Sequence, residues 1–368
     1  MVVKILWGVR RATLVAVMVV AICGPGSRSA AHNRESQVTW TTDVEAILQR
    51  RCVGCHAAGG FGPMPLATYQ DARAWAKSIR QEVLERRMPP WPAARGFGDF
   101  LNDRSLTPVE VELLTSWADG AAPLGPPVVR SGLTSPPTEV RQTIVHRESG
   151  DADFVIVEPA DRRVTALVDR IELATNLAGD RWVTGWEFEP GNRSIVQQAV
   201  VWIAPAFSTP QTRGRRTFLG AWTPSEDEVV YPAGVAQRLP AGSRLEIDLR
   251  YRRSAAPQID RSGIRLRFGA RPARELRHRS LSCGASAIDR DVDALAVTPR
   301  AAEAGASIEV VARHADGSVE PLSVVPRYEP AYPISYRFRK NVRLTRGTTI
   351  ETRSSSPGCS AELEFVGS

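Results

Sequence analysis

The sequence lacks any run of basic residues, although its formal net charge is +7. Four of the positive charges, Lys4, Arg10, Arg11 and Arg28, lie in the first 31 residues, which contain no acidic residue. The rest of the chain therefore carries about +3 (7 − 4), with basic and acidic residues interspersed. Nucleic-acid-binding surfaces gather their basic residues on one face or segment. The charge pattern therefore excludes nucleic acid as an expected partner.

The chain also lacks an N-terminal apolar run of comfortable membrane-spanning length. The run from Ala12 to Cys23 is shorter than the roughly 20 residues that a transmembrane helix needs. It follows basic residues and precedes the small residues Ser29-Ala30-Ala31, a pattern typical of a secretory leader. We expect residues 1–31 to be a cleaved signal peptide and the mature protein to be periplasmic or otherwise exported, without a membrane span. The alternatives are an uncleaved anchor or a lipoprotein modified at Cys23, for which Ile22 is an unfavourable preceding residue.

Cysteine is scarce, and its positions restrict what each thiol can do. Five cysteines occur, one of them in the leader, which leaves four in an oxidising compartment. Cys283 and Cys359 frame the last part of the chain, and we expect them to form a disulfide. In the chain-entropy model a loop of this length contributes on the order of 4 kcal/mol. The alternative is two buried thiols.

A length of 368 residues is too great for one compact domain. From Thr41 to Gly120 the apolar spacing is helical. A capping box at Thr42 and Glu45 predicts a helix leading into the cysteine motif, and a second helix is predicted from Thr68 to Met88. A third is predicted from Thr107, with Pro108 at its first position and Glu110 completing a capping box, to Gly120.

A Pro/Gly/Ser-rich linker is expected at 126–150, and beyond it the spacing of apolar residues changes from helical to every second residue. Beyond residue 150, apolar residues alternate with polar ones, as in Leu245, Ile247, Leu249 and Tyr251. Turns rich in Gly and Pro separate such segments, which predicts β-sandwiches. The expected domains are a helical domain at 36–125, a first sandwich at 151–270 and a second at 271–368.

The motif CVGCH, residues 52–56, carries the most specific chemical signal. Thiols at Cys52 and Cys55 are spaced for covalent attachment to the two vinyl groups of a haem, and His56 is placed to ligate its iron. Half a zinc site or a thioredoxin-like redox pair are the alternatives. Neither is favoured, because no second cysteine pair follows at zinc spacing and no βαβ pattern surrounds the motif. The sequence therefore predicts one covalent haem c.

No histidine follows His56 within the helical domain, so only Met64 and Met88 could be the sixth iron ligand. Met88 precedes Pro89-Pro90, where the helix must end, whereas Met64 lies only eight residues after His56. We therefore predict Met88 as the distal ligand, with Met64 the less favoured candidate. Trp75, Trp91 and Trp117 are expected to pack around the haem.

A family resemblance follows from these segments. The stretches DVEAILQRRCVGCH, GPMPLATYQDARAWAKSI, RRMPPW and LTPVEVELLTSWADGAAP resemble the cytochrome c domain that precedes copper type II ascorbate-dependent monooxygenase-like domains in exported bacterial proteins. WEFEPGNRSIVQQAVVWI, LPAGSRLEIDLRYRR, PRAAEAG and VPRYEPAYPISYRF resemble the monooxygenase-like domains, which are related to peptidylglycine α-hydroxylating monooxygenase. The resemblance implies a multidomain α + β protein, a small class I-like cytochrome c domain followed by two jelly-roll antiparallel β-sandwiches.

The copper ligands that this resemblance implies are replaced. Its His-His pair corresponds to Gln197-Gln198, its His-x-His to Arg250 and Arg252, and its P-H-M-H to the segment containing Arg300 and Ala302. Residues 89–368 contain no methionine and only three histidines, His146, His278 and His314, in charged surroundings that predict surface positions. Gln is a weak copper ligand and Arg is always protonated. We expect no copper at these positions.

Three functions are compatible with this sequence. The favoured hypothesis is an electron-transfer cytochrome whose copper-free, inactive monooxygenase-like module serves for docking to a redox partner protein or for binding. The second is an active copper monooxygenase that receives its electrons from the haem. The third is a non-redox protein whose sandwiches bind a small molecule, peptide or glycan, since fold alone does not decide function.

Overall fold

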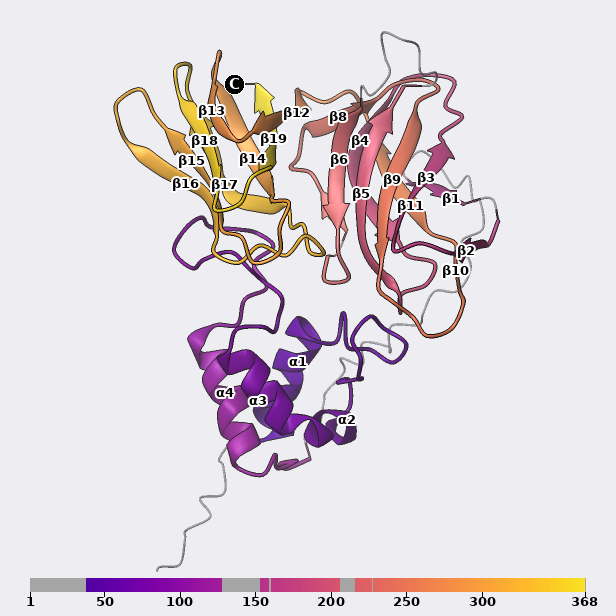
Figure 1. Ribbon diagram of the computed structural model, residues 1–368, viewed down its shortest axis with the longest axis vertical. Helices are drawn as coiled ribbons and strands as arrows, with labels where there is room; N and C mark the ends of the chain where they lie inside the picture. Colours follow the sequence, from indigo (N-terminus) through magenta and orange to yellow (C-terminus); the bar gives the residue numbers. More distant parts are fainter. Residues whose placement is uncertain (1–37, 128–152, 159, 206–215, 227, 368) are drawn as a thin grey trace, which may run out of the picture. The chain divides into compact units, whose positions relative to one another are not determined.

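A computed structural model describes residues 38–127, 153–158, 160–205, 216–226 and 228–367 (Figure 1). The predicted signal peptide and all but the first two residues of the predicted linker lie outside these ranges. Residues 36–368 belong to one compact unit. None of the helices within the described ranges has the length and apolar character needed to cross a membrane.

Helices occupy the first described segment. They are a π-helical turn Trp40–Val44, α1 Glu45–Arg51, α2 Tyr69–Ala74, α3 Ala76–Leu84 and α4 Pro108–Asp119. Their apolar faces meet in one core. The residues buried in it include Trp40, Val44, Ile47, Leu48, Ile79, Val83, Leu114 and Trp117.

The start of α4 agrees with its sequence signals. The Thr107 side chain accepts a hydrogen bond from the Glu110 backbone N–H, and the Glu110 side chain accepts one from the Thr107 N–H. Pro108 occupies the first helical position and Gly120 is the C-cap. This capping box satisfies two N–H groups that a helix terminus would otherwise leave without partners.

The other helix boundaries differ from those predicted. The first helical turn is capped by Thr39 rather than Thr42, because the Thr39 side chain accepts from the Thr42 N–H. The second predicted helix is interrupted at Trp75, whose N–H bonds to the Ala72 carbonyl three residues back, and it ends at Leu84 rather than Met88. Trp75 is 42% exposed, so it does not belong to the buried stripe in which the helical spacing placed it.

Most of the remaining structure is β, as expected, and its largest part is a nine-stranded sheet (Figure 1). Eight strands follow one another in the order β1 Asp153–Val157, β11 Gly263–Gly269, β4 Arg181–Glu189, β8 Val235–Leu239, β12 Arg274–Ser282, β19 Ser360–Gly367, β14 Val292–Arg300 and β17 Tyr336–Leu344. The short strand β7 Val229–Val230 pairs with β4.

Three smaller sheets complete the β structure. The first is β3 Val168–Ala174, β9 Arg244–Tyr251, β5 Val196–Ala204 and β6 Thr217–Trp222. The second is β13 Gly284–Ala287, β18 Thr349–Ser354, β15 Ile308–Arg313 and β16 Val319–Val325. The third is the pair β2 Arg162–Val164 and β10 Gln258–Asp260.

Two β-sandwich cores result from this arrangement. One end of the nine-stranded sheet packs on the β3-β9-β5-β6 sheet, and the other end packs on the β13-β18-β15-β16 sheet. Strand β9 illustrates why the sequence forms such layers, because Leu245, Ile247, Leu249 and Tyr251 are all buried while the residues between them are only partly so. The prediction that residues beyond 150 form β-sandwiches is confirmed.

The two sandwiches share one sheet, which the sequence pattern did not predict. Strand β8 of the first sandwich pairs in parallel with β12 of the second, with Val235 opposite Arg274 and Gln237 opposite Leu276. Backbone hydrogen bonds therefore continue from one sandwich into the other.

Residues 91–100, which were assigned to the helical domain, pack on the second sandwich instead. Ala93 and Phe100 are buried in its core, and Trp91 lies with its ring centroid 5.2 Å from that of Tyr336. The Ala94 N–H donates to the Val324 carbonyl, and Phe100 forms a bridge to Phe338. The expectation that Trp91 packs around the haem finds no support in this position.

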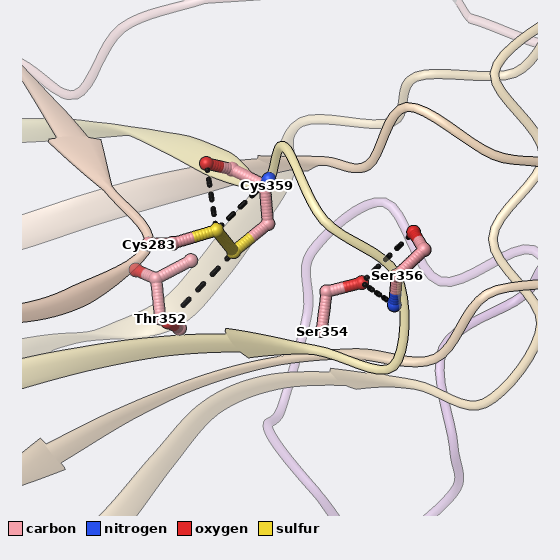
Figure 2. Close-up of a disulfide and its surroundings, with 5 residues drawn as sticks. All are labelled: Cys283, Thr352, Ser354, Ser356 and Cys359. Atoms are coloured by element: carbon pink, nitrogen blue, oxygen red, sulfur yellow. Dashed lines mark hydrogen bonds between the residues drawn. A yellow bond between two sulfur atoms is a disulfide. The ribbon is translucent and has the colours of Figure 1, made fainter.

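The predicted disulfide between Cys283 and Cys359 is confirmed (Figure 2). Cys283 lies between β12 and β13, and Cys359 lies between β18 and β19. Both strand pairs pass there from the nine-stranded sheet to the sheet that covers it. The Cys283 N–H also donates to the Cys359 carbonyl at 3.2 Å, so the bond closes a corner of the second sandwich.

Candidate functional site

The cysteine motif forms a tight turn at the end of α1. Cys52 is the C-cap of the helix, and the His56 N–H donates to the Cys52 carbonyl at 2.9 Å. Arg51, immediately before the motif, donates to Glu110 at 3.2 Å and so ties the end of α1 to α4. Neither Cys52 nor Cys55 forms a disulfide.

His56 is held so that one ring nitrogen can ligate a metal. The imidazole is buried, and its Nδ1 lies 3.0 Å from the Met64 carbonyl oxygen. A carbonyl oxygen only accepts hydrogen bonds, so Nδ1 carries the proton and Nε2 keeps its lone pair. Histidines that ligate metals have the same arrangement, with the other ring N–H donated to a carbonyl or carboxylate.

The loop after His56 folds back tightly over the imidazole. Gly62 donates its N–H to the Cys55 carbonyl at 2.7 Å, and Leu66 donates to the His56 carbonyl at 2.8 Å. A Cβ at Gly62 would lie 2.4 Å from His56 Nδ1, so only glycine allows this approach. The loop therefore fixes the orientation of the histidine.

The thiol of Cys52 has the wrong electrostatic environment for a redox-active pair. Burial, with smaller contributions from the neighbouring Cys55 and Glu110, raises the pKa of this thiol to about 12, although Arg51 lowers it. Thioredoxin-like cysteines have lowered pKa values, because the thiolate is the nucleophile. The environment therefore disfavours the dithiol alternative.

The two candidate methionines lie in different surroundings. Met64 packs against the helical core, and its own carbonyl is the acceptor for His56 Nδ1. Met88 is 38% exposed, like several other large apolar side chains of the described residues. Among the tryptophans, Trp117 is fully buried in the helical core.

The positions for which the sequence resemblance implied copper ligands lie mainly on neighbouring strands of the first sandwich. Gln198 on β5 pairs with Arg250 on β9, and Gln197 is the bulged residue beside it. Arg252 follows β9 and donates its Nη1–H to the Phe61 carbonyl at 2.9 Å. Ala302, on the second sandwich, is exposed.

Arg300 joins this group from the second sandwich. Its guanidinium carbon lies 5.2 Å from the ring centroid of Trp202 on β5 and 5.4 Å from that of Phe218 on β6. Burial lowers the pKa of Arg300, and its Nε and Nη2 have no hydrogen-bond partner. The two aromatic faces therefore help to stabilise the guanidinium, together with the charge of the nearby Glu362.

Within the described ranges, no group of three or more His, Cys, Asp or Glu side chains is arranged so that it could hold a metal ion. His314 is near the surface, with Nε2 3.3 Å from Glu320. His146 lies outside the described residues.

His278 is only partly exposed, although its charged surroundings predicted a surface position. Its two ring nitrogens are shielded from solvent without hydrogen-bond partners, and burial lowers the pKa of the imidazole to about 3. Strand β12 lies inside the nine-stranded sheet between β8 and β19, and the Phe218 ring packs 5.6 Å from the imidazole. The charged neighbours in sequence gave no sign of this burial.

Two buried carboxylates beside His278 were also missed by sequence reasoning. Glu364 pairs with His278 across β19 and β12, and Glu362 lies two residues earlier. Burial raises the pKa of Glu364 to about 7, whereas the nearby Arg337 lowers it and Glu362 raises it. The alternation in AELEF indicated a polar face, which is covered here by the first sandwich.

A cavity of about 370 Å³ lies beside Arg51 but does not include the motif cysteines or His56. Aromatic side chains of Trp91 and Phe100 and the guanidinium groups of Arg95 and Arg339 line it. The cavity is therefore separate from the pocket that a haem on the motif would need.

No protein-family model matches this chain, and no curated protein sequence matches it. Among solved structures, a peptide-N(4)-(N-acetyl-β-D-glucosaminyl) asparagine amidase is similar at 8% identity with a TM-score of 0.31, over 58% of this chain and 96% of that chain. The major capsid protein P2 from bacteriophage PM2 is similar at 11% identity with a TM-score of 0.27, over 58% and 97%. At TM-scores this low, neither likeness bears on the function of this chain.

Proposed function

We propose that this protein is an exported mono-haem c-type cytochrome that transfers electrons, with a copper-free β-sandwich module that serves for docking or binding. The single observation that carries the proposal is the CVGCH turn, in which both thiols are unbridged and His56 has its Nδ1 proton bound to the Met64 carbonyl. The lone pair of Nε2 can then ligate iron.

The residues of the motif fit a covalent haem. Cys52 and Cys55 would form the thioethers and His56 would be the proximal ligand. Met88 is the preferred distal ligand. The Met64 carbonyl is bonded to Nδ1, which lies on the opposite edge of the imidazole from the Nε2 that would ligate the iron. When bound, the haem supplies an Fe(III)/Fe(II) couple suited to outer-sphere electron transfer, and a methionine ligand raises its potential relative to a second histidine.

The side chains at the copper-related positions support a module without copper. Gln197, Gln198, Arg250, Arg252 and Arg300 offer weak or permanently protonated groups where imidazoles would be needed. Arg252 and Arg300 are also engaged with aromatic rings. We therefore place the redox chemistry at the haem and give the sandwiches a role in recognising a redox partner protein or a small ligand.

Export is supported by the leader-like N-terminus and by the disulfide, since disulfides persist in oxidising compartments. The same compartment is where covalent haem attachment to a CxxCH motif takes place in bacteria.

The test is expression of the full chain in a bacterium that matures c-type cytochromes, followed by metal analysis and a pyridine haemochrome spectrum of the mature protein. We expect stoichiometric iron, negligible copper and a haem that stays on the denatured chain. The double variant C52A/C55A should lose the covalent haem, whereas C283S should keep it. Tightly bound copper that supports ascorbate-driven oxygen uptake would favour the monooxygenase alternative instead.

A further inference from the structure

One side chain of the first sandwich reaches the loop that holds His56. Arg252 donates its Nη1–H to the Phe61 carbonyl at 2.9 Å, and its guanidinium carbon lies 5.2 Å from the centroid of the Phe61 ring. A planar guanidinium can make both contacts together, whereas an ammonium group lacks the plane that stacks on a ring. Two independent contacts from one residue therefore hold the loop.

Arg252 is itself well anchored. Its backbone N–H donates to the Ile195 carbonyl at 2.9 Å, at the end of β9 where the chain leaves the sheet. Tyr332, from the second sandwich, lies close to the same place: burial raises the pKa of its phenol, Cys55 raises it further, and Gln197 and Arg252 lower it. Groups from both sandwiches therefore lie near the CVGCH motif and the loop that follows it.

The loop in turn controls His56. Phe61 precedes Gly62, which packs against the imidazole, and Met64, whose carbonyl accepts the Nδ1 proton. Such a hydrogen bond fixes the ring and makes the imidazole a stronger electron donor to its metal. A displacement of residues 57–64 would therefore change the donor strength of His56.

We propose that Arg252 is a positioning residue for the haem ligand: through Phe61 it holds the loop 57–64, and this fixes the hydrogen bond between His56 Nδ1 and the Met64 carbonyl. The proposal rests on the function proposed above and adds to it a physical coupling between the first sandwich and the redox centre. The first sandwich then helps to set the midpoint potential of the haem.

The direction in which the midpoint potential changes distinguishes a positioning role of Arg252 from a purely electrostatic one. A loosened loop weakens the hydrogen bond to His56, the imidazole stabilises Fe(III) less, and the midpoint potential rises. Loss of a nearby positive charge, by contrast, stabilises Fe(III) and lowers the potential. A lysine at this position keeps the charge but not the stacked geometry.

The experiment compares the mature full chain with its R252A, R252K and R250A variants. Arg250, two residues earlier on β9, has no hydrogen bond to the loop and is the matched control. We expect R252A and R252K to raise the midpoint potential and to speed hydrogen exchange at the Gly62 and Leu66 amides, with R250A unchanged in both.

Each other result counts against the proposal. A potential that falls in R252A and stays at the wild-type value in R252K would mean a purely electrostatic role. Unchanged exchange, or faster exchange without a shift in potential, would mean that Arg252 does not act on His56. A haem-free wild-type chain would overturn the proposed function as well, whereas a haem-loaded chain with unresponsive variants would overturn this inference alone.

Discussion

Replacing Glu364 by glutamine should change how the stability of the second sandwich depends on pH. This carboxyl is 7% exposed and lies in the middle of β19, facing the first sandwich. Burial raises its pKa from the ordinary value of 4.5 to about 7. The native state therefore keeps a proton that the unfolded chain has already released.

The magnitude follows from these two pKa values. Below pH 4.5 both states hold the proton, so Glu364 causes no loss of stability there. Between that value and about 7 the native state binds more protons than the unfolded state, and the free energy of unfolding falls by about 1.4 kcal/mol per pH unit. The total loss that Glu364 causes in the wild-type protein is about 3 kcal/mol.

Glutamine has nearly the same shape and no proton to lose. We expect E364Q to match the wild type near pH 4 and to be more stable by about 3 kcal/mol at pH 8. The measurement is urea unfolding across this pH range, followed by far-ultraviolet circular dichroism, with E309Q at an exposed position of β15 as the control. An E364Q protein with the wild-type pH dependence, or with lower stability at pH 8, would refute the reasoning.

The remaining predictions concern the iron ligand, the disulfide and the α4 cap. M88A should lower the midpoint potential and let carbon monoxide bind the ferrous iron, and M64A should do neither, as followed by redox titration and absorption spectra. C283S should lower the free energy of unfolding by on the order of 4 kcal/mol in urea, and equal stability of the oxidised wild type and the variant would contradict this. T107A should destabilise the helical segment by about 1 kcal/mol in thermal unfolding, whereas T107S, which keeps the capping oxygen, should not.

Much of the candidate site could be read from short stretches of sequence, because its chemistry depends on close neighbours in the chain. The CVGCH spacing is itself the signal for haem attachment, and the Thr107-Pro108-Glu110 cap of α4 needs only local hydrogen bonds. The hydrogen bond from His56 to the Met64 carbonyl was not visible in the sequence. It depends on the path of the loop, although Gly62 in the GFGPM stretch is a signal that could have indicated a close backbone approach.

The sequence pattern failed where burial comes from a partner strand or sheet far away in the chain. His278 lies in LRHRS and Glu364 in AELEF, both with the alternation of a strand that has one exposed face. Residues of the first sandwich lie against that face, since the Phe218 ring packs on His278 and the Glu364 carboxylate raises the pKa of Tyr231. The contact of Trp91 with Tyr336 is also between segments far apart in the chain. No local pattern indicates it, and Trp91 was therefore expected to pack around the haem.

By itself, the sequence predicted the haem attachment at Cys52, Cys55 and His56 that we propose, and it determined the disulfide partners, the capped α4 helix and the layered β character. Each of these depends on residue type and on spacing along the chain. Only the tertiary structure decided that the two sandwiches share a sheet, that Glu364 and the ring nitrogens of His278 are buried, and that Arg252 reaches the loop beside His56. Such features depend on strand pairing and packing between distant segments, and no local pattern encodes them.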